Sequence, residues 1–240
     1  MDKVACVTGT DRGLGLSITR VLLEQNYKVF AGQHREDSEN LKALKAEYPQ
    51  QLEPVLLDIG RKESVKQAAR LIAGKTGHVD MLINNAGIIR SADDATMLVD
   101  MDDEAMAEIY NVNTLGALRV SNALMGLLLQ GEDKLIVNIS SEAGSIGSNQ
   151  RINMYGYCMS KAALNMQSSL MHNHLKTLGG QVMVFHPGWL QTYMSGMKKD
   201  EADYSADEAA GKIMKLVLDY PAYKGEEPAY LDLNGQAWPW

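Results

Sequence analysis

The stretch Val4-Ala5-Cys6-Val7-Thr8-Gly9-Thr10-Asp11-Arg12-Gly13-Leu14-Gly15 decides the fold of this chain. Its apolar beginning is typical of a buried strand, and the glycines that follow allow a tight turn. From Leu14 to Asn26 the apolar residues then recur at helical spacing. A strand, a glycine-rich turn and a helix in this order predict a site where the free N–H groups of the helix start face a phosphate group.

The same alternation continues along the chain. Six further apolar runs are expected to be buried strands, at residues 29–31, 54–57, 79–83, 135–139, 182–185 and 229–231. Helical stretches lie between most of them, at residues 38–48, 62–75, 103–130, 155–178 and 205–219. Strands that alternate with helices predict an α/β fold with a doubly wound, mainly parallel, seven-stranded sheet covered by helices on both faces. We expect residues 1–240 to form one domain, with its ligand at the carboxyl ends of the strands.

Composition excludes several other classes of protein. The chain has 240 residues, 45% of them hydrophobic, and a net charge of −7, which argues against a nucleic-acid binder because such proteins present a basic surface to phosphates. No apolar run is long enough to span a membrane, and no Cys/His/Asp cluster has metal-ligand spacing. Only two cysteines, Cys6 and Cys158, are present, so we expect a reducing, cytoplasmic location.

The glycine spacing, T-G-x-x-x-G-x-G, resembles that of the short-chain dehydrogenase/reductase family. Four further motifs of that family follow in the family's order, and each lies at an expected strand end or helix: N-N-A-G at 84–87, N-x-x-G at 113–116, the serine Ser141, and Y-x-x-x-K from Tyr157 to Lys161. The resemblance covers the chain from Val4 to Trp240. It implies a Rossmann-type oxidoreductase that moves a hydride between a nicotinamide cofactor and a carbonyl or alcohol carbon.

Tyr157 and Lys161 are four residues apart on an expected helix, so their side chains share one face. A tyrosine hydroxyl has a pKa of about 10 and exchanges protons poorly at neutral pH. A nearby ammonium group favours the phenolate, so we expect Lys161 to lower the pKa of Tyr157 and make it an acid/base group. Taken alone, the same spacing also fits an ordinary pair on a helix surface.

The resemblance assigns two further catalytic roles. Ser141 would orient the substrate oxygen, with Ser140 as a possible neighbour, and Asn113 would bend its helix and hold a water in a proton relay, with Asn111 as the fallback. Without the resemblance, Ser141 fits a capping serine and Asn113 a surface amide.

The resemblance also implies a set of cofactor contacts: Gly9, Asp11, Arg12, Gly13, Leu14, Gly15, His34, Arg35, Asp58, Ile59, Asn85, Ala86, Gly87, Tyr157, Lys161, Pro187, Gly188, Leu190 and Thr192. A site that prefers NAD(H) usually has an acidic residue after the second strand, whereas a 2′-phosphate requires basic groups. Residues 32–35 contain no acid, and Arg12 and Arg35 are basic, so NADP(H) is favoured and NAD(H) remains possible. Asp11 complicates this preference, because its carboxylate could lie near the 2′-phosphate.

Residues 154–165, 186–192 and 232–235 resemble the carbonyl-reductase branch that includes sniffer and the C-factor signalling proteins, although Tyr193 stands where that branch commonly has aspartate. A substrate loop is expected at about 189–204, where Trp189, Tyr193, Met194 and Met197 would favour an apolar carbonyl compound. The expected partners are this small molecule and further copies of the chain, as a homodimer or homotetramer. A dinucleotide-binding signalling or redox-sensor protein with little turnover is the alternative, and a sugar-nucleotide epimerase ranks last.

Overall fold

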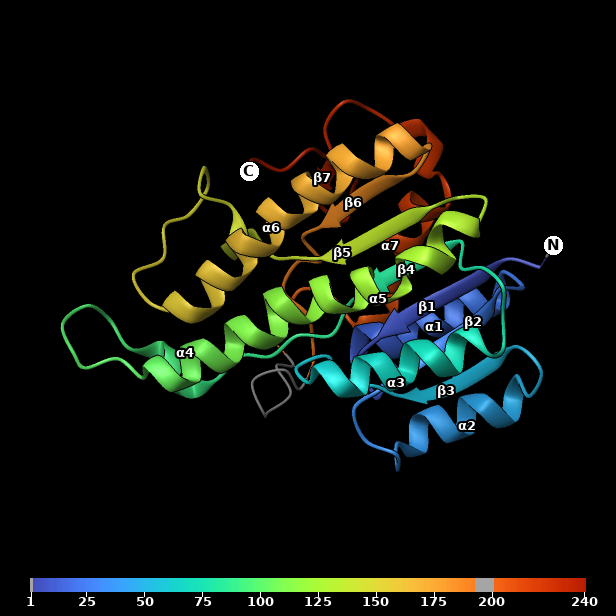
Figure 1. The fold of residues 1–240 in the computed structure, drawn as a ribbon. Helices are drawn as coiled ribbons and strands as arrows, with labels where there is room; N and C mark the ends of the chain where they lie inside the picture. Colours follow the sequence, from blue (N-terminus) through green and yellow to red (C-terminus); the bar gives the residue numbers. More distant parts are fainter. Residues whose placement is uncertain (1, 193–200) are drawn as a thin grey trace.

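A single sheet forms the centre of the molecule. The computed structural model describes residues 2–192 and 201–240, and Figure 1 shows their arrangement. The strands are β1 (Val4–Thr8), β2 (Lys28–Gln33), β3 (Leu52–Leu56), β4 (Met81–Asn84), β5 (Leu135–Ile139), β6 (Gln181–Phe185) and β7 (Ala229–Leu231). All six pairings between neighbouring strands are parallel. The predicted seven-stranded doubly wound sheet is therefore confirmed.

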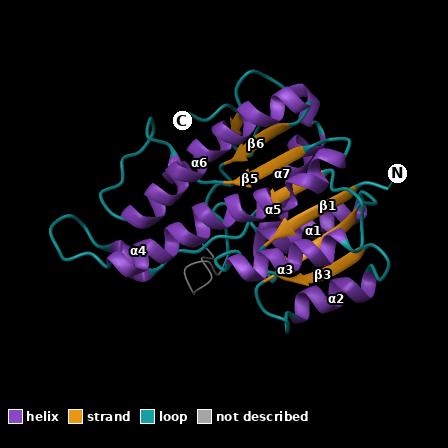
Figure 2. Ribbon diagram, in the orientation of Figure 1, coloured by secondary structure: helices purple, strands orange, loops and turns teal. Residues whose placement is uncertain are grey.

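Helices connect the strands and cover both faces of the sheet (Figure 2). They are α1 (Gly13–Glu24), α2 (Glu39–Glu47), α3 (Lys62–Ala73), α4 (Asp103–Tyr110), α5 (Ala117–Gln130), α6 (Tyr155–Leu175) and α7 (Ala206–Leu218). Short 3₁₀ turns lie between these elements, at Ser91–Asp94, Glu142–Gly144, Lys176–Leu178 and Tyr220–Tyr223. The first two of these turns lie in the connections that follow β4 and β5.

The strand order is β3-β2-β1-β4-β5-β6-β7, so the order in which the chain adds strands to the sheet reverses between β1 and β4. From β1 it proceeds outward to β3, then returns to place β4 on the other side of β1. The connections that leave the carboxyl ends of β1 and β4 therefore diverge, and a crevice opens between them. This topology places the glycine turn after β1 beside the Asn-Asn-Ala-Gly segment after β4.

Two apolar cores fill the space between the sheet and its helices. One contains Ile18 of α1 and Ile213 of α7, and the other contains Val65 of α3 and Leu124 of α5, all of which are buried. Successive side chains of each strand point alternately to these two cores. Because both faces are covered, nearly every strand position is apolar, which explains the unbroken apolar runs in the sequence.

The long helix expected at 103–130 differs from the prediction. A π-helical segment, η2 (Asn111–Gly116), separates α4 from α5 and inserts a wider turn into the helix. The spacing of apolar residues before and after this segment does not reveal it, because the helix axis continues through the segment. By length and composition, Asp103–Gln130 could cross a membrane, but Val120 and Leu124 on its inner face are buried in the core.

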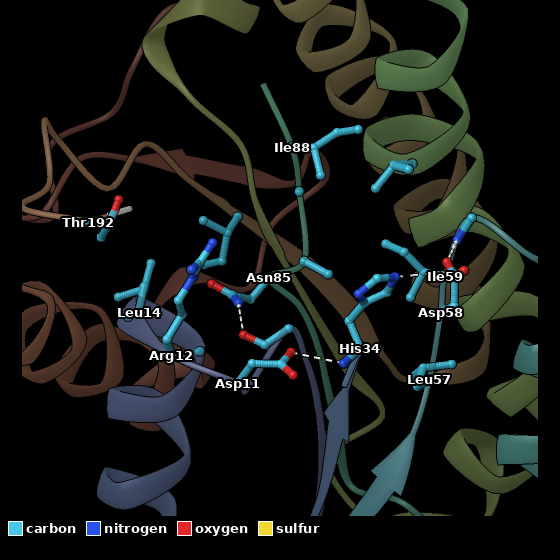
Figure 3. A pocket seen from close by; sticks show the side chains of 18 of the residues that line it. Asp11, Arg12, Leu14, His34, Leu57, Asp58, Ile59, Asn85, Ile88 and Thr192 are labelled. Carbon is cyan, nitrogen blue, oxygen red and sulfur yellow. Dashed lines mark hydrogen bonds and ion pairs between the residues drawn. The ribbon is translucent and has the colours of Figure 1, made fainter. Parts of the chain in front are cut away.

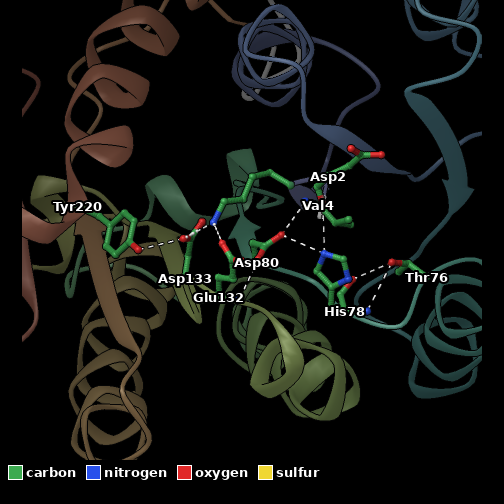
Figure 4. Close-up of polar contacts among 9 residues, drawn as sticks. Asp2, Val4, Thr76, His78, Asp80, Glu132, Asp133 and Tyr220 are labelled. Atoms are coloured by element: carbon green, nitrogen blue, oxygen red, sulfur yellow. Dashed lines mark hydrogen bonds and ion pairs between the residues drawn. The ribbon is translucent and has the colours of Figure 1, made fainter.

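A polar network fixes the edge of the sheet at the amino ends of its strands (Figure 4). The buried carboxylate of Asp80 accepts hydrogen bonds from the backbone N–H groups of Val4 and Glu132, each at 2.8 Å. Lys3 forms an ion pair with Asp133 at 2.7 Å, and Tyr220 donates to the same carboxylate at 3.0 Å. These bonds tie β1 to the turn before β5 and to the 3₁₀ turn after α7, and they lie at the opposite end of the sheet from the crevice.

Candidate active site

The glycine turn after β1 has the backbone geometry that its sequence requires. Gly9 and Gly13 have φ angles of +71° and +59°, in the left-handed region that favours glycine. A Cβ atom on Gly15 would overlap the carbonyl oxygen of Gly9 and the side-chain amide of Asn85. The turn is therefore packed tightly enough to exclude any larger side chain at Gly15, and its backbone lies open to a ligand at the start of α1.

Asn85 fastens this turn to the end of β4. Its side-chain amide donates to the carbonyl oxygens of Thr8 at 2.9 Å and Gly9 at 3.1 Å. In return, the Thr8 hydroxyl accepts from the backbone N–H groups of Asn85 and Ala86, each at 3.0 Å. The glycine motif and the Asn-Asn-Ala-Gly motif, far apart in sequence, thus form one rigid wall of the crevice.

A cavity of about 850 Å³ occupies the crevice, a size within the range of small-molecule and cofactor sites. Figure 3 shows part of its lining. All but one of the predicted cofactor contacts line it: Gly9, Asp11, Arg12, Gly13, Leu14, Gly15, His34, Arg35, Asp58, Ile59, Asn85, Ala86, Gly87, Tyr157, Lys161, Pro187, Leu190 and Thr192. The exception is Gly188, whose φ of +72° turns the chain beneath Tyr204. Ser38, Arg61, Ile88, Arg90 and Val112 also line the cavity and were not predicted.

Asp11 has a structural role that its position in the motif did not reveal. Its two carboxylate oxygens accept hydrogen bonds from the backbone N–H groups of His34 at 2.9 Å and Arg35 at 3.0 Å. In Figure 3 the carboxylate points toward the end of β2. The turn that carries His34 and Arg35 is thereby held against the glycine loop, and the negative charge of Asp11 is bound by two amide dipoles.

Asp58 follows β3 on the opposite side of this end of the cavity. One of its oxygens accepts from the N–H of Gly60 at 2.9 Å, which makes a local turn, and the other lies 3.9 Å from the His34 ring. Its backbone N–H is bound by Ser64 at 2.9 Å. The side chains after β2 and β3 therefore face one another, and Asp58 serves at once as a turn residue and as a cavity wall.

Tyr157 and Lys161 lie deep in the cavity, on the first two turns of α6. Both are buried, with exposed fractions of 9% and 3%. The Lys161 ammonium donates to the backbone carbonyl of Ile139, at the end of β5, at 2.9 Å, and it lies 5.7 Å from the centre of the Tyr157 ring. The predicted face-sharing pair is present, and the lysine is held by the sheet as well as by its helix.

Burial dominates the electrostatics of this pair. It raises the pKa of Tyr157 to about 12, although a hydrogen bond from Ser141 and the charge of Arg151 act in the opposite direction. It also lowers the pKa of Lys161 to about 8. Burial of the phenolate therefore outweighs the groups that favour it, and the expectation that Lys161 lowers the pKa of Tyr157 stays a prediction. At neutral pH Tyr157 holds its proton.

Ser141 begins the 3₁₀ turn after β5 and is buried beside Tyr157. Its hydroxyl accepts from the backbone N–H of Ala143 at 3.2 Å and donates to the carboxylate of Glu142 at 2.7 Å. Its carbonyl oxygen accepts from the Tyr230 hydroxyl at 2.6 Å, a contact that fixes the serine from β7. Ser141 is thus the capping serine that its sequence also permitted.

Asn113 lies in the π-helical segment, and its side chain forms three hydrogen bonds. Its side chain accepts from the N–H of Ile88 at 2.7 Å and donates to the carbonyl of Ile88 at 2.9 Å and to Ser160 at 3.1 Å. It therefore joins the chain after β4 to α6. It does not line the cavity itself, whereas Asn111 does, because the Asn113 side chain points into the protein.

Asp93 is a residue that the sequence analysis missed. It is buried in the 3₁₀ turn after β4, and its carboxylate accepts from the backbone N–H groups of Gly156 and Tyr157, each at 2.7 Å. Its own carbonyl accepts from the N–H of Met154 at 2.9 Å. Asp93 therefore caps the start of α6 from a distant segment, directly at the tyrosine.

The segment after β6 closes the cavity on the side opposite the β2 turn. Thr192 approaches the glycine turn, since a Cβ on Gly13 would lie 3.5 Å from its methyl group. Trp189 is half exposed. Tyr193, Met194 and Met197, which were expected to form the substrate loop, lie outside the residues that the structure describes.

Known proteins match this chain in both sequence and structure. A model of the short chain dehydrogenase family matches residues 3–203. The C-signal protein of Myxococcus xanthus is 36% identical over 165 residues, which are 69% of this chain and 95% of that protein. The NADPH-bound carbonyl reductase from chicken fatty liver superposes with a TM-score of 0.85 at 30% identity, over 100% of this chain and 99% of the other. Carbonyl reductase Sniffer of D. melanogaster has the same fold, with a TM-score of 0.86 at 24% identity over 100% of both chains.

Proposed function

Because this chain belongs to the short chain dehydrogenase family, we propose that it is an NADP(H)-dependent carbonyl reductase with Tyr157 as its general acid. One observation carries this proposal: Tyr157 and Lys161, both buried, line the same cavity as the glycine turn. A dinucleotide with its phosphates at the start of α1 could extend through this cavity to Tyr157. The NADPH-bound carbonyl reductase from chicken fatty liver, which has the same fold, supports the choice of cofactor.

In the proposed reduction each residue of the site has a separate role. A bound reduced nicotinamide supplies the hydride. Tyr157 donates its proton to the substrate oxygen, and its high pKa ensures that the proton is present at neutral pH. Lys161 would stabilise the resulting phenolate by its charge. Ser141 would orient the substrate oxygen if its hydroxyl turned away from Glu142, to which it donates in the structure. Asn113 fixes the chain after β4 against α6, and thereby the distance between cofactor wall and tyrosine.

The preference for NADP(H) is supported by the charges at the β2 end of the cavity. Arg12 and Arg35 both line it, and residues 32–35 contain no acid. Asp11, the residue that argued against a 2′-phosphate, has its carboxylate bound to two backbone N–H groups. An arginine forks onto a phosphate with two parallel hydrogen bonds, so either guanidinium suits a 2′-phosphate.

The proposal is tested by the absorbance of the reduced cofactor during incubation with a panel of aldehydes, ketones and diketones. We expect turnover with at least one apolar carbonyl compound, and a loss of about a hundredfold or more in Tyr157→Phe, which removes only the hydroxyl. Unchanged NADPH binding in that variant would show that its fold is intact. Full turnover by Tyr157→Phe would reject the role of the tyrosine.

A signalling or sensing protein with little turnover is the second candidate, because the chain is 36% identical to the C-signal protein over 165 residues. A protein that only binds the dinucleotide has no need of a buried Tyr157 beside Lys161 in the cofactor cavity. Tight binding of NADPH without turnover of any carbonyl compound in the panel would favour this candidate over the reductase.

We further propose a cytoplasmic homodimer or homotetramer. Both cysteines are free thiols, as expected in a reducing compartment. Helices α5 and α6 expose Leu118, Met166 and Leu170 at 41%, 64% and 64%, and a second copy of the chain could cover these side chains. Light scattering gives the mass in solution, and a monomer at micromolar concentration would contradict the assembly.

A further inference from the structure

The last strand of the sheet continues into a segment that folds back on it. After β7 the chain turns, and Leu231 pairs with Ala237 in an antiparallel bridge. The backbone N–H of Trp238 donates to the carbonyl of Tyr230 at 2.7 Å. Residues 229–240 therefore form a hairpin, the β7 hairpin, and Figure 1 shows its end, marked C, beside the loop that follows β5.

One side chain of the β7 hairpin reaches the serine of the proposed reaction. Tyr230 is buried, and its hydroxyl donates to the backbone carbonyl of Ser141 at 2.6 Å. The same carbonyl accepts the N–H of Gly144 at 3.0 Å, within the 3₁₀ turn. Removal of the Tyr230 hydroxyl would therefore break the bond between hairpin and serine and still leave this carbonyl with a donor. Because the bond is made to the backbone, it fixes the position of Ser141 and leaves the serine hydroxyl available to other partners.

A second contact lies a few residues further along the loop. The carbonyl oxygen of Trp240 accepts the N–H of Gly147 at 2.9 Å and the hydroxyl of Ser145 at 3.5 Å. A Cβ on Gly147 would lie 3.2 Å from this oxygen, so the two backbones approach closely. The rings of Trp240 and Tyr230 pack against each other, with their centres 5.0 Å apart. One packed unit of the β7 hairpin therefore binds both ends of residues 141–147, the serine turn.

A third contact passes through the end of β6. The ring of Trp238 lies against that of His186, with ring centres 4.8 Å apart. Nδ1 of His186 in turn accepts the backbone N–H of Glu142 at 3.1 Å. From α6, the side-chain amide of Asn165 donates to the carbonyl of Gly144 at 3.0 Å. The serine turn is thus held by α6 as well as by the β7 hairpin.

The other end of the same loop is held from a different part of the molecule. Asp93, in the turn after β4, accepts the backbone N–H groups of Gly156 and Tyr157, each at 2.7 Å. The loop from Ser141 to Tyr157 is therefore fixed at the tyrosine by the connection after β4 and at the serine by the β7 hairpin. The placement of these two side chains relative to one another depends on both attachments.

We propose that the β7 hairpin is a positioning element of the active site, in which the Tyr230 hydroxyl sets the place of Ser141 relative to Tyr157. This inference rests on the proposed function, in which Ser141 orients the substrate oxygen and Tyr157 donates the proton. Tyr230 is not among the described residues that line the cavity, so it acts through the backbone of Ser141. Because a small displacement of an orienting group slows the chemical step, the effect belongs to kcat.

The first test compares two tyrosines. Tyr230→Phe removes the hydroxyl and keeps the ring that packs against Trp240, and we expect kcat for carbonyl reduction to fall about tenfold while the KM for NADPH is unchanged. Tyr220→Phe is the matched control, because it removes a hydroxyl that donates to Asp133 at 3.0 Å at the opposite end of the sheet, and it should retain the wild-type kcat. A wild-type kcat in Tyr230→Phe, or equal losses in the two variants, would overturn the inference.

A double-variant cycle tests whether Tyr230 acts through Ser141. In a Ser141→Ala background the orienting hydroxyl is already absent, so Tyr230→Phe should lower the residual kcat by about twofold or less. A further tenfold loss in that background would show that Tyr230 supports the site independently of the serine, and the positioning role would be rejected.

A measurement without substrate separates this inference from the proposed function. Hydrogen–deuterium exchange of the ligand-free protein, followed by mass spectrometry, should be about tenfold faster in the serine turn of Tyr230→Phe than in wild type, and unchanged at the start of α6. This result would support the attachment of the turn to the hairpin even in a protein without turnover. Unchanged exchange in the serine turn, or a rise spread over the whole chain, would overturn the inference whether or not the protein is a reductase.

Discussion

The carboxylate of Asp93 accepts a hydrogen bond from the backbone N–H of Tyr157 at 2.7 Å, across 64 positions of sequence. A second bond at 2.7 Å comes from Gly156, so one side chain binds two of the free N–H groups at the start of α6. A negative charge at this position also interacts favourably with the helix dipole. Asp93 lies on the segment that leaves the Asn-Asn-Ala-Gly wall of the cavity, and it therefore couples the placement of the tyrosine to that wall.

Replacement of Asp93 should misplace the tyrosine while the fold survives. In Asp93→Ala we expect a loss of about 2 kcal/mol in the free energy of unfolding from the lost helix cap. Because small displacements of a reacting group are costly, kcat should fall about tenfold or more while the KM for NADPH changes little. Urea unfolding and steady-state kinetics measure the two effects.

Asp93→Asn serves as the conservative variant, since its amide oxygen still accepts one of the two bonds, and it should recover part of the lost kcat. Asp94→Ala changes the exposed neighbour and should leave both quantities unaltered. An Asp93→Ala protein with wild-type kcat would show that α6 holds Tyr157 without this cap.

The sequence predicted the sheet, the helices and most of the cavity lining because these depend on local patterns. The apolar runs of β1 and β5 and the glycines of the first turn each carry their own signal. Asp93 carries none, since its role depends on a contact with a helix that begins far along the chain. The ion pair between Glu142 and Arg151 depends in the same way on the path of the loop between them.

One local prediction failed, and two properties of the site could not be predicted, for physical reasons. The π-helical turn around Asn113 keeps the apolar spacing of an ordinary helix, so the pattern could not reveal it. The net pKa of Tyr157 could not be predicted from the nearby Lys161, because burial from water, which no pattern of spacing measures, dominates it. Asp11 could not be assigned from the motif, because its partners are backbone N–H groups on another strand.

Arg35 should discriminate between the two dinucleotides. Arg35→Ala removes a cationic group at the β2 end of the cavity, where a 2′-phosphate would lie, and we expect NADPH to bind about tenfold or more weakly. The affinity for NADH should change little, since NADH has no phosphate there. Titration calorimetry with each cofactor measures both constants. Arg20→Ala, on the outer face of α1, is the matched control, and an equal loss for both cofactors in Arg35→Ala would contradict the assignment.

Asp80 should matter for stability and not for turnover. Its carboxylate binds the backbone N–H groups of Val4 and Glu132 at the end of the sheet opposite the cavity (Figure 4). Asp80→Ala leaves both groups without this acceptor, and we expect a loss of about 3 kcal/mol in the free energy of unfolding. Asp80→Asn retains one acceptor and should lose less. A large fall in kcat at a temperature where the variant is folded would show that this network reaches the active site.

We expect the buried ammonium of Lys161 to serve the reaction and to lower the stability of the folded protein. Its ammonium is buried with one backbone partner, and burial lowers its pKa from 10.5 to about 8. Between these two values the unfolded chain holds a proton that the folded chain does not, so stability attributable to Lys161 rises with pH from about 8 to 10.5. At pH values below this window folding must bury the charge. Lys161→Met removes that penalty, and we expect the variant to lack turnover yet to unfold at neutral pH with a free energy about 1 kcal/mol higher than wild type.

The comparison should be made across pH, because other groups titrate in the same range. The difference in unfolding free energy between wild type and Lys161→Met isolates the lysine, and the advantage of the variant should shrink as the pH rises through the window. Lys66→Met, on the exposed side of α3, controls for the general effect of a methionine. If the variant were less stable than wild type at neutral pH, with a difference independent of pH, the bond to the Ile139 carbonyl would outweigh the cost of burying the charge.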